Sequence, residues 1–188
     1  FANGRDFSVV QPVEAPNKGY GNSTTISFDV KDAATAKIVL LGLAETLGMR
    51  IRKDEAEIQV VSLDICDCEF NRISHQRVLE NPTDITKEIY QAAARLLDEA
   101  WNQMPIRKLG IHTGKVGEAG WSRQMSLFDS GDYLKEKRWD RTIDHIRYRH
   151  GMDAIKRAVF LGQPRIDHLS GGISREKRSV DYAKIKID

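Results

Sequence analysis

The sequence of 188 residues predicts an α+β fold in which two helices cover one face of a four-stranded sheet, followed by a helical C-terminal extension. Two observations predict it. Apolar residues recur at the spacings of strand, helix, strand, strand, helix and strand, in that order, and a strongly charged helical pattern follows them. The order βαββαβ is typical of the split βαβ arrangement, which leaves the second face of the sheet open. We therefore expect a binding surface on that open face.

The first 22 residues carry no sustained apolar period, and Pro12, Pro16 and Gly19 interrupt any regular element. They are interpreted as a tether. The first strand is expected at 23–30, where apolar residues alternate with Thr, Ser and Asp. This alternation indicates a strand that is covered on one side only.

The first helix is expected from about residue 33 to about residue 50. Asp32 can accept a hydrogen bond from the first turn, and apolar residues at helical spacing follow it. They are Ala36, Leu40, Leu43, Ala44 and Leu47. Gly48 and the Lys53–Asp54 pair are expected to end the helix.

The second and third strands are expected at 57–66 and 70–79, joined as a hairpin by the short connection at 67–69. In the second strand Val61, Leu63 and Ile65 alternate with residues of the other face, which are Val60, Ser62 and Asp64.

The second helix has the clearest pattern in the chain, with apolar residues at i, i+3 and i+4 spacing from Ile89 to Ala100. The segment 81–84, Asn-Pro-Thr-Asp, is interpreted as a stop signal and the start of this helix. Pro105 closes the segment, and a fourth strand is expected at 106–113.

A charged helix is expected at 132–150, with Trp139, Ile143 and Ile146 along one side, and a shorter helix at 153–161. The apolar stripe of the longer helix could pack on the domain, bind a partner or mediate self-association.

The composition, with 40% hydrophobic and 30% charged residues, is ordinary for a globular protein and contains no apolar run long enough for a membrane span. The net charge of +2 does not by itself indicate nucleic-acid binding. The chain starts at Phe1 with neither a signal peptide nor a presequence, so we expect a cytoplasmic protein and a piece cut from a longer chain. Cys66 and Cys68 are expected to be reduced thiols.

Catalytic patterns are absent from the sequence. Asp64 and Asp67 are three residues apart on an extended segment, so they should point to opposite sides rather than converge on a metal ion. No glycine-rich phosphate loop follows a strand, and the five histidines share no metal-ligand spacing. We expect no active site here.

The polar sheet face is expected to carry short hydrogen-bond donors and cations, with the cations on the two outer strands. These residues are Thr25, Ser27, Ser62, Ser74, Gln76, Arg72, Arg77, Arg107 and Lys108. Such groups suit a phosphate backbone. Aromatic residues that could stack on bases are absent from the third and fourth strands except at Phe70, which favours a duplex over a single strand. The alternative is an ordinary solvated face.

The segment Gln124-Met125-Ser126-Leu127-Phe128 places a Leu-Phe pair in a polar stretch that has neither helical nor strand periodicity. Leu127 and Phe128 could enter the hydrophobic pocket of a partner while the Gln124 amide fixes the register. The alternative is that the pair packs back on its own domain. The segment resembles the pentapeptide with which bacterial DNA polymerases bind the sliding clamp.

Four motifs together carry a wider resemblance: Lys-Gly-Tyr-Gly-Asn-Ser-Thr-Thr at 18–25, Ser-His-Gln-Arg at 74–77, Ile-Arg-Lys-Leu-Gly-Ile at 106–111 and the pentapeptide at 124–128. Their order and spacing resemble the C-terminal part of a Y-family translesion DNA polymerase of the polymerase IV type. The resemblance covers roughly residues 18–161.

The resemblance implies a thumb remnant and tether at 1–22, a little finger DNA-binding domain at 23–115 and a clamp-binding linear motif at 116–130. It leaves a helical extension at 131–162 and a tail of unknown role at 163–188. In many members of the family the clamp motif lies near the C-terminal end, whereas here residues 129–188 follow it.

In that family the little finger domain grips DNA phosphates with its sheet. By position, the resemblance implies DNA contacts at Thr24, Thr25, Ser74, Gln76, Arg77, Arg107 and Lys108. It implies clamp contacts at Gln124, Met125, Ser126, Leu127 and Phe128. The expected partners are duplex primer-template DNA and the sliding clamp, and no membrane.

The palm of the family, with its metal-binding carboxylates, has no counterpart in this sequence. We therefore expect a parent that is a DNA-directed DNA polymerase in translesion synthesis and DNA repair, and a fragment that does not polymerise alone. No cofactor is expected in the fragment, and magnesium is expected in the missing palm. The alternative functions are a protein-interaction module without DNA binding and, with less support, a free-standing enzyme of unrecognised chemistry.

Overall fold

The computed structural model describes residue 4 and residues 17–118, 133–161 and 166. Its elements are β1 (Gly21–Val30), α1 (Ala33–Lys53), β2 (Ala56–Asp67), β3 (Arg72–Thr83), α2 (Thr86–Ala100), β4 (Ile106–Glu118), α3 (Tyr133–His150) and the 3₁₀ helix η1 (Ala158–Phe160). The predicted α+β fold with its βαββαβ order and C-terminal helix is confirmed.

The four strands form one antiparallel sheet in the order β1-β4-β2-β3. Strand β4 lies between β1 and β2, and β2 lies between β4 and β3, so each βαβ unit is split by a strand of the other. The expectation that Arg107 and Lys108 lie on an outer strand is wrong, because β4 pairs on both sides and the edges of the sheet are β1 and β3.

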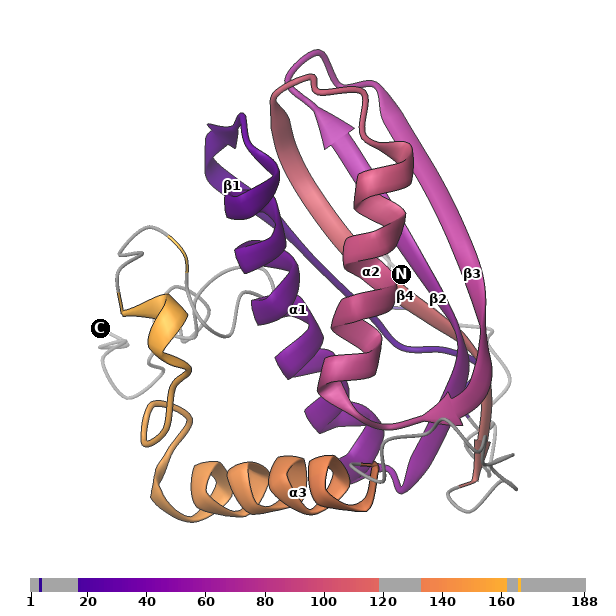
Figure 1. Ribbon diagram of the computed structural model, residues 1–188, viewed down its shortest axis with the longest axis vertical. Helices are drawn as coiled ribbons and strands as arrows, with labels where there is room; N and C mark the ends of the chain where they lie inside the picture. The colour runs from indigo at the N-terminus through magenta and orange to yellow at the C-terminus, as the bar shows by residue number, and fades with distance from the viewer. Residues whose placement is uncertain (1–3, 5–16, 119–132, 162–165, 167–188) are drawn as a thin grey trace.

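Both α1 and α2 pack on the same face of the sheet, and no described helix lies on the other face (Figure 1). Leu63 and Ile65 of β2 and Leu109 of β4 are buried in one hydrophobic cluster with Leu43 of α1 and Leu97 of α2. Burial of one such side chain contributes about 1.5–3 kcal/mol relative to exposure. The layer between sheet and helices is therefore the core, and it explains the apolar half of each alternating pattern.

Helix α1 begins where the sequence predicts and ends later. The Asp32 carboxylate accepts a hydrogen bond from the backbone N–H of Thr35 at 2.7 Å, and this bond lowers the pKa of Asp32. Gly48 does not end the helix, which continues to Lys53. A Cβ at position 48 would lie 2.7 Å from Oγ1 of Thr86. The role of Gly48 is therefore to let α2 approach α1 closely, not to end the helix.

The end of β3 and the segment 153–161 also differ from the prediction. Strand β3 continues to Thr83 through the expected stop signal, because β3 is an edge strand and an edge tolerates Pro82, which has no N–H to donate. The expected helix at 153–161 is wrong, since only 158–160 form a 3₁₀ turn. The Arg147 guanidinium donates to the carbonyl of Ile155 and so occupies an acceptor that a helix would use.

Helix α3 crosses the end of α1 next to the start of α2 (Figure 1). Its contact is largely ionic: Arg52 of α1 binds Asp144 at 2.6 Å and Asp140 at 3.1 Å, and Arg147 binds Glu45 at 2.8 Å. These five side chains are at most 9% exposed. The apolar stripe of α3 packs on the domain only in part. Ile143 is buried there, whereas Trp139 is 57% exposed.

Burial and polar partners act in opposite directions on the pKa values of the groups in this contact. Burial alone would lower the pKa of the Arg52 guanidinium, but the hydrogen bond to Asp144 and the charges of Asp140 and Asp144 outweigh it, and the net pKa is raised. Burial raises the pKa of Asp84, which Lys137 contacts at 3.2 Å. The pKa of Lys137 is also raised, because its contacts with Glu57 and Asp84 outweigh its own burial.

Candidate nucleic-acid interface

The open sheet face is built from residues that pair across neighbouring strands, because paired residues point to the same side. One row crosses all four strands and contains Thr25, Lys108, Cys66 and Arg72. A second row contains Ser23, Gly110, Asp64 and Ser74, and a third contains Gly21, His112, Ser62 and Gln76. These three rows are thus mostly polar, whereas the next row of the face, Gly114, Val60 and Val78, is apolar.

The first of these rows, called the charged row here, holds two exposed cations. Lys108 lies on an inner strand and Arg72 on the edge strand β3, and neither forms an ion pair with another described residue. Thr25 at the other edge adds an exposed hydroxyl. The row can therefore offer two charges and one donor to an anionic ligand that crosses the strands.

The third row carries a histidine beside an acid of the second row. Nε2 of His112 lies 2.9 Å from Oδ2 of Asp64, and both side chains are about half exposed, at 48% and 47%. Asp64 places a carboxylate on a face that otherwise suits anions.

Arg107 lies at one end of the sheet, in a bulge. Cys66 pairs with Lys108 and Asp67 with Ile106, so Arg107 is the extra residue of β4 between them. Its guanidinium lies 5.2 Å from the centre of the Phe70 ring, and its Nε lies 3.4 Å from Oδ1 of Asp29. The bulge therefore separates Arg107 from the charged row and places it beside an exposed aromatic ring.

Two predicted residues lie on the other side of the sheet. Thr24 pairs with Leu109 and Arg77 with Val61, and both partners are buried in the core. The expectation that Arg77 shares the open face with Gln76 is therefore wrong, because successive residues of a strand alternate between faces. Thr25, Ser74, Gln76 and Lys108 lie on the open face as expected.

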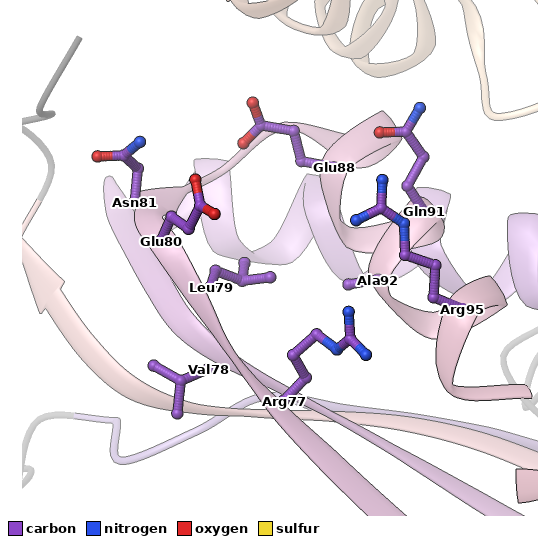
Figure 2. A pocket seen from close by; sticks show the side chains of 9 residues that line it. All are labelled: Arg77, Val78, Leu79, Glu80, Asn81, Glu88, Gln91, Ala92 and Arg95. Carbon is purple, nitrogen blue, oxygen red and sulfur yellow. The ribbon is translucent and has the colours of Figure 1, made fainter. Parts of the chain in front are cut away.

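Arg77 instead joins β3 to α2. Figure 2 shows it pointing into a pocket of about 350 Å³ between these elements, together with Arg95 of α2. The guanidinium forms an ion pair with Glu99 of α2. Glu80 and Glu88 also line this pocket, so its charges are mixed and Arg77 serves the contact between strand and helix.

Arg72 and His112 also lie on this face, although the sequence-based DNA contacts do not include them. The signal that finds both is the period of two, counted along β3 from Ser74 and along β4 from Lys108.

The clamp-binding prediction for residues 124–128 falls outside the described residues. Within the part of the chain that the structure describes, no three His, Cys, Asp or Glu side chains gather as metal ligands. Cys66 and Cys68 are free thiols. No described helix is long and apolar enough to cross a membrane.

Residues 17–127 match the model of the impB/mucB/samB family C-terminal domain. The chain belongs to this family. Its sheet domain is the little finger domain of the Y-family and is homologous to that of DNA polymerase IV.

Curated relatives that match this chain are DNA polymerase IV proteins. DNA polymerase IV of Clostridium acetobutylicum is 33% identical over 161 residues, which is 86% of this chain and 40% of the relative. DNA polymerase IV of Clostridium kluyveri is 33% identical over 83% of this chain and 41% of the relative. DNA polymerase IV 2 of Bacillus subtilis is 31% identical over 85% and 39%. The chain thus spans about 40% of the length of these relatives.

A solved complex of a beta-clamp processivity factor and the little finger domain of PolIV is 18% identical to this chain. The match covers 58% of this chain and 98% of the matched chain of that structure, with a TM-score of 0.45. At this score the likeness does not bear on the function of the present chain.

Proposed function

We propose that this chain grips duplex DNA by its phosphates through the open sheet face and docks on a sliding clamp through residues 124–128. The observation that carries the DNA part is the charged row, where Lys108 and Arg72 are exposed without a described ionic partner. Ser74 of the second row and Ser62 and Gln76 of the third row add hydroxyl and amide donors on one side of the charged row.

Phosphates are favoured over bases because the groups of this face are short donors and cations, which position a backbone without reading its sequence. The rows hold no Phe, Tyr or Trp ring on which a base could stack. Binding should therefore tolerate many sequences and depend strongly on salt.

We therefore propose DNA contacts at Thr25, Arg72, Ser74, Gln76, Arg107 and Lys108. Thr24 and Arg77, which the resemblance also implied, face the helices and are not proposed as contacts.

The relatives are DNA polymerases, which supports the proposal that the whole protein is a translesion polymerase. The catalytic carboxylates and magnesium would then belong to the palm domain, and the present chain would hold the polymerase on its DNA.

The DNA part is tested with Lys108→Gln and Arg72→Gln combined. We expect the slope of log Kobs against log salt to become shallower by about 1.8, at about 0.9 for each lost phosphate contact. Fluorescence anisotropy with a labelled duplex measures it. The matched control is Arg77→Gln, which removes an arginine of the same strand from the opposite face and should leave the slope unchanged.

A slope that Arg77→Gln alone makes shallower by about 0.9, the change expected for each open-face cation, would contradict the assignment of the open face. A wild-type chain that binds no duplex at low salt would instead support the alternative, a protein-interaction module.

Asp64→Asn tests the same face with the opposite sign. Removal of a carboxylate about 8 Å from a phosphate should favour binding by about 0.5 kcal/mol at the dielectric constant of water, or roughly twofold in affinity. The same anisotropy titration measures it at low salt. Unchanged binding would show that DNA does not approach this part of the sheet.

The clamp part is tested with Leu127→Ala and Phe128→Ala combined. Loss of two apolar side chains from a docking peptide should abolish binding to an immobilised sliding clamp, while the affinity for duplex DNA stays at the wild-type value. Retained clamp binding would remove this part of the proposal and leave the DNA part intact.

A further inference from the structure

The charges of α3 are separated by face. Each of its three acidic residues is paired on the side of the domain: Glu136 with Lys87 at 2.7 Å, and Asp140 and Asp144 with Arg52. The buried residues Asp140, Ile143, Asp144 and Arg147 define this inner side.

The opposite side of α3 carries exposed cations, called the α3 stripe here: Lys135, Arg138, Arg141 and Arg149. At 3.6 residues per turn they fall within an arc of about 120°, centred opposite the buried residues, and span about 21 Å of the helix axis. None forms an ion pair with a described residue. Arg138 donates from Nε to the carbonyl of Leu134, one turn earlier in the same helix.

A helix face that only contacts solvent would gain from mixed charges, because opposite charges three or four residues apart stabilise a helix and like charges destabilise it. The stripe instead places Lys135 beside Arg138 and Arg138 beside Arg141, and no acid lies among them. A chain with a net charge of only +2 thus concentrates four cations on one helix face.

The neighbours of the stripe decide between kinds of partner. The other residues within this arc are Leu134 at its N-terminal end, which is 65% exposed, and the polar, exposed Thr142 and His145. The centre of a protein interface is usually apolar and poor in charge, whereas nucleic-acid interfaces are polar and strongly positive. The stripe matches the second type.

The stripe is also separate from the open sheet face. Helix α3 lies at the end of α1, on the helix side of the sheet (Figure 1). The buried ion pairs of Arg52 and Arg147 hold it on the domain, so its cations occupy set positions relative to the sheet.

We propose that the α3 stripe is a second DNA-binding surface that contacts phosphates beyond those held by the sheet. It extends the proposed function to another surface of the same chain and rests on the binding of DNA by this chain. The contacts are charge to phosphate and therefore independent of sequence.

The test uses the full chain with Lys135→Gln, Arg138→Gln and Arg149→Gln combined. Glutamine keeps the helix propensity of the replaced residues, and Arg141 is retained because it lines a hollow beside Asp144 in the α3 contact. The salt slope of duplex binding should become shallower by about 2.7. Anisotropy over a salt series measures the slope, and circular dichroism checks the fold.

The matched control removes three cations on the helix side of the sheet away from α3, as Lys31→Gln, Lys37→Gln and Arg95→Gln combined. It lowers the net charge equally and should leave the slope close to wild type. If the triple variant of the stripe does not fold, Arg138→Gln alone should lower the slope by about 0.9.

An unchanged slope in the stripe variant overturns this inference, and so does an equal loss in the control, which would indicate net charge rather than a surface. A wild-type chain without duplex binding overturns both proposals. A loss confined to the stripe variant, with Lys108→Gln and Arg72→Gln without effect, would leave the stripe as the DNA-binding surface and remove the sheet proposal.

Discussion

Single side chains decide where elements start and what each face offers. Asp32 starts α1 by accepting the N–H of Thr35, and Gly48 lets α2 approach α1 where a Cβ would meet Thr86. On β3, Arg72 and Arg77 are five residues apart and therefore lie on opposite faces, one exposed on the open face and one paired with Glu99 of α2. The type of a residue therefore indicates its role only when the face of the strand on which it lies is known.

Asp32→Ala should lower the free energy of unfolding by about 1 kcal/mol at neutral pH, because the first turn of α1 loses its cap. The pKa of Asp32 is lowered in the folded state. The stabilisation is therefore present above the ordinary value of 3.8 and is lost as the pH falls through the lower folded value. Urea unfolding at several pH values measures it.

Asp32→Asn is the matched control for the cap. Asparagine keeps an acceptor for the N–H of Thr35 but does not ionise, so its stability should stay near that of wild type and lose the pH dependence of the cap. If Asp32→Ala is as stable as wild type at pH 7, this side chain does not cap α1.

Whole elements are held in place by groups from other elements. Helix α2 starts at Thr86, and the preceding residue, Ile85, provides no side-chain cap. The backbone N–H of Thr86 donates instead to Oδ2 of Asp140 on α3, at 2.7 Å. The same carboxylate binds Arg52 of α1. The Asp140 carboxylate of α3 thus accepts an N–H from the first turn of α2 and also binds α1, so it connects three helices.

Asp140→Ala should destabilise the protein by roughly 3 kcal/mol, because it uncaps α2 and removes one of two acidic partners from the buried Arg52 guanidinium. Hydrogen exchange should increase at the amides of the first turn of α2 and along α3. Asp98→Ala is the control, since Asp98 forms an exposed pair with Lys37, and such pairs contribute little. Unchanged exchange at Thr86 would show that Asp140 does not cap α2.

Across the molecule, two sets of charges serve different purposes. The ion pairs between α3 and the domain are buried, with the Arg52 and Arg147 side chains 6% and 3% exposed. The cations of the charged row and of the α3 stripe are exposed. Salt screens exposed charges strongly and buried pairs weakly.

Stability and DNA affinity should therefore respond differently to salt. Between 50 and 200 mM salt the duplex affinity should fall about a thousandfold, as for some six phosphate contacts, while the free energy of unfolding changes by less than about 1 kcal/mol. Anisotropy and urea unfolding of the same preparation measure the two quantities. Release of α3 at the higher salt, seen as faster hydrogen exchange in α3, would contradict the buried ionic contact.

The sequence by itself determined the local structure: six elements of the domain in order, the cap at Asp32 and the alternation that puts Thr25 and Lys108 away from the core. These features depend on residues a few positions apart, whose spacing matches the periods of helix and strand. The same alternation places Thr24 and Arg77 toward the helices, because they pair with the buried residues Leu109 and Val61.

Only the tertiary structure decided the position of β4 inside the sheet, the bulge at Arg107 and the docking of α3 through Arg52, Asp140 and Asp144. Each depends on groups distant in the chain, and Arg52 and Asp144 are 92 positions apart. Burial in the folded protein determines which of these polar groups meet, because a buried charge without a partner is too costly to persist. No local pattern in the sequence records that choice.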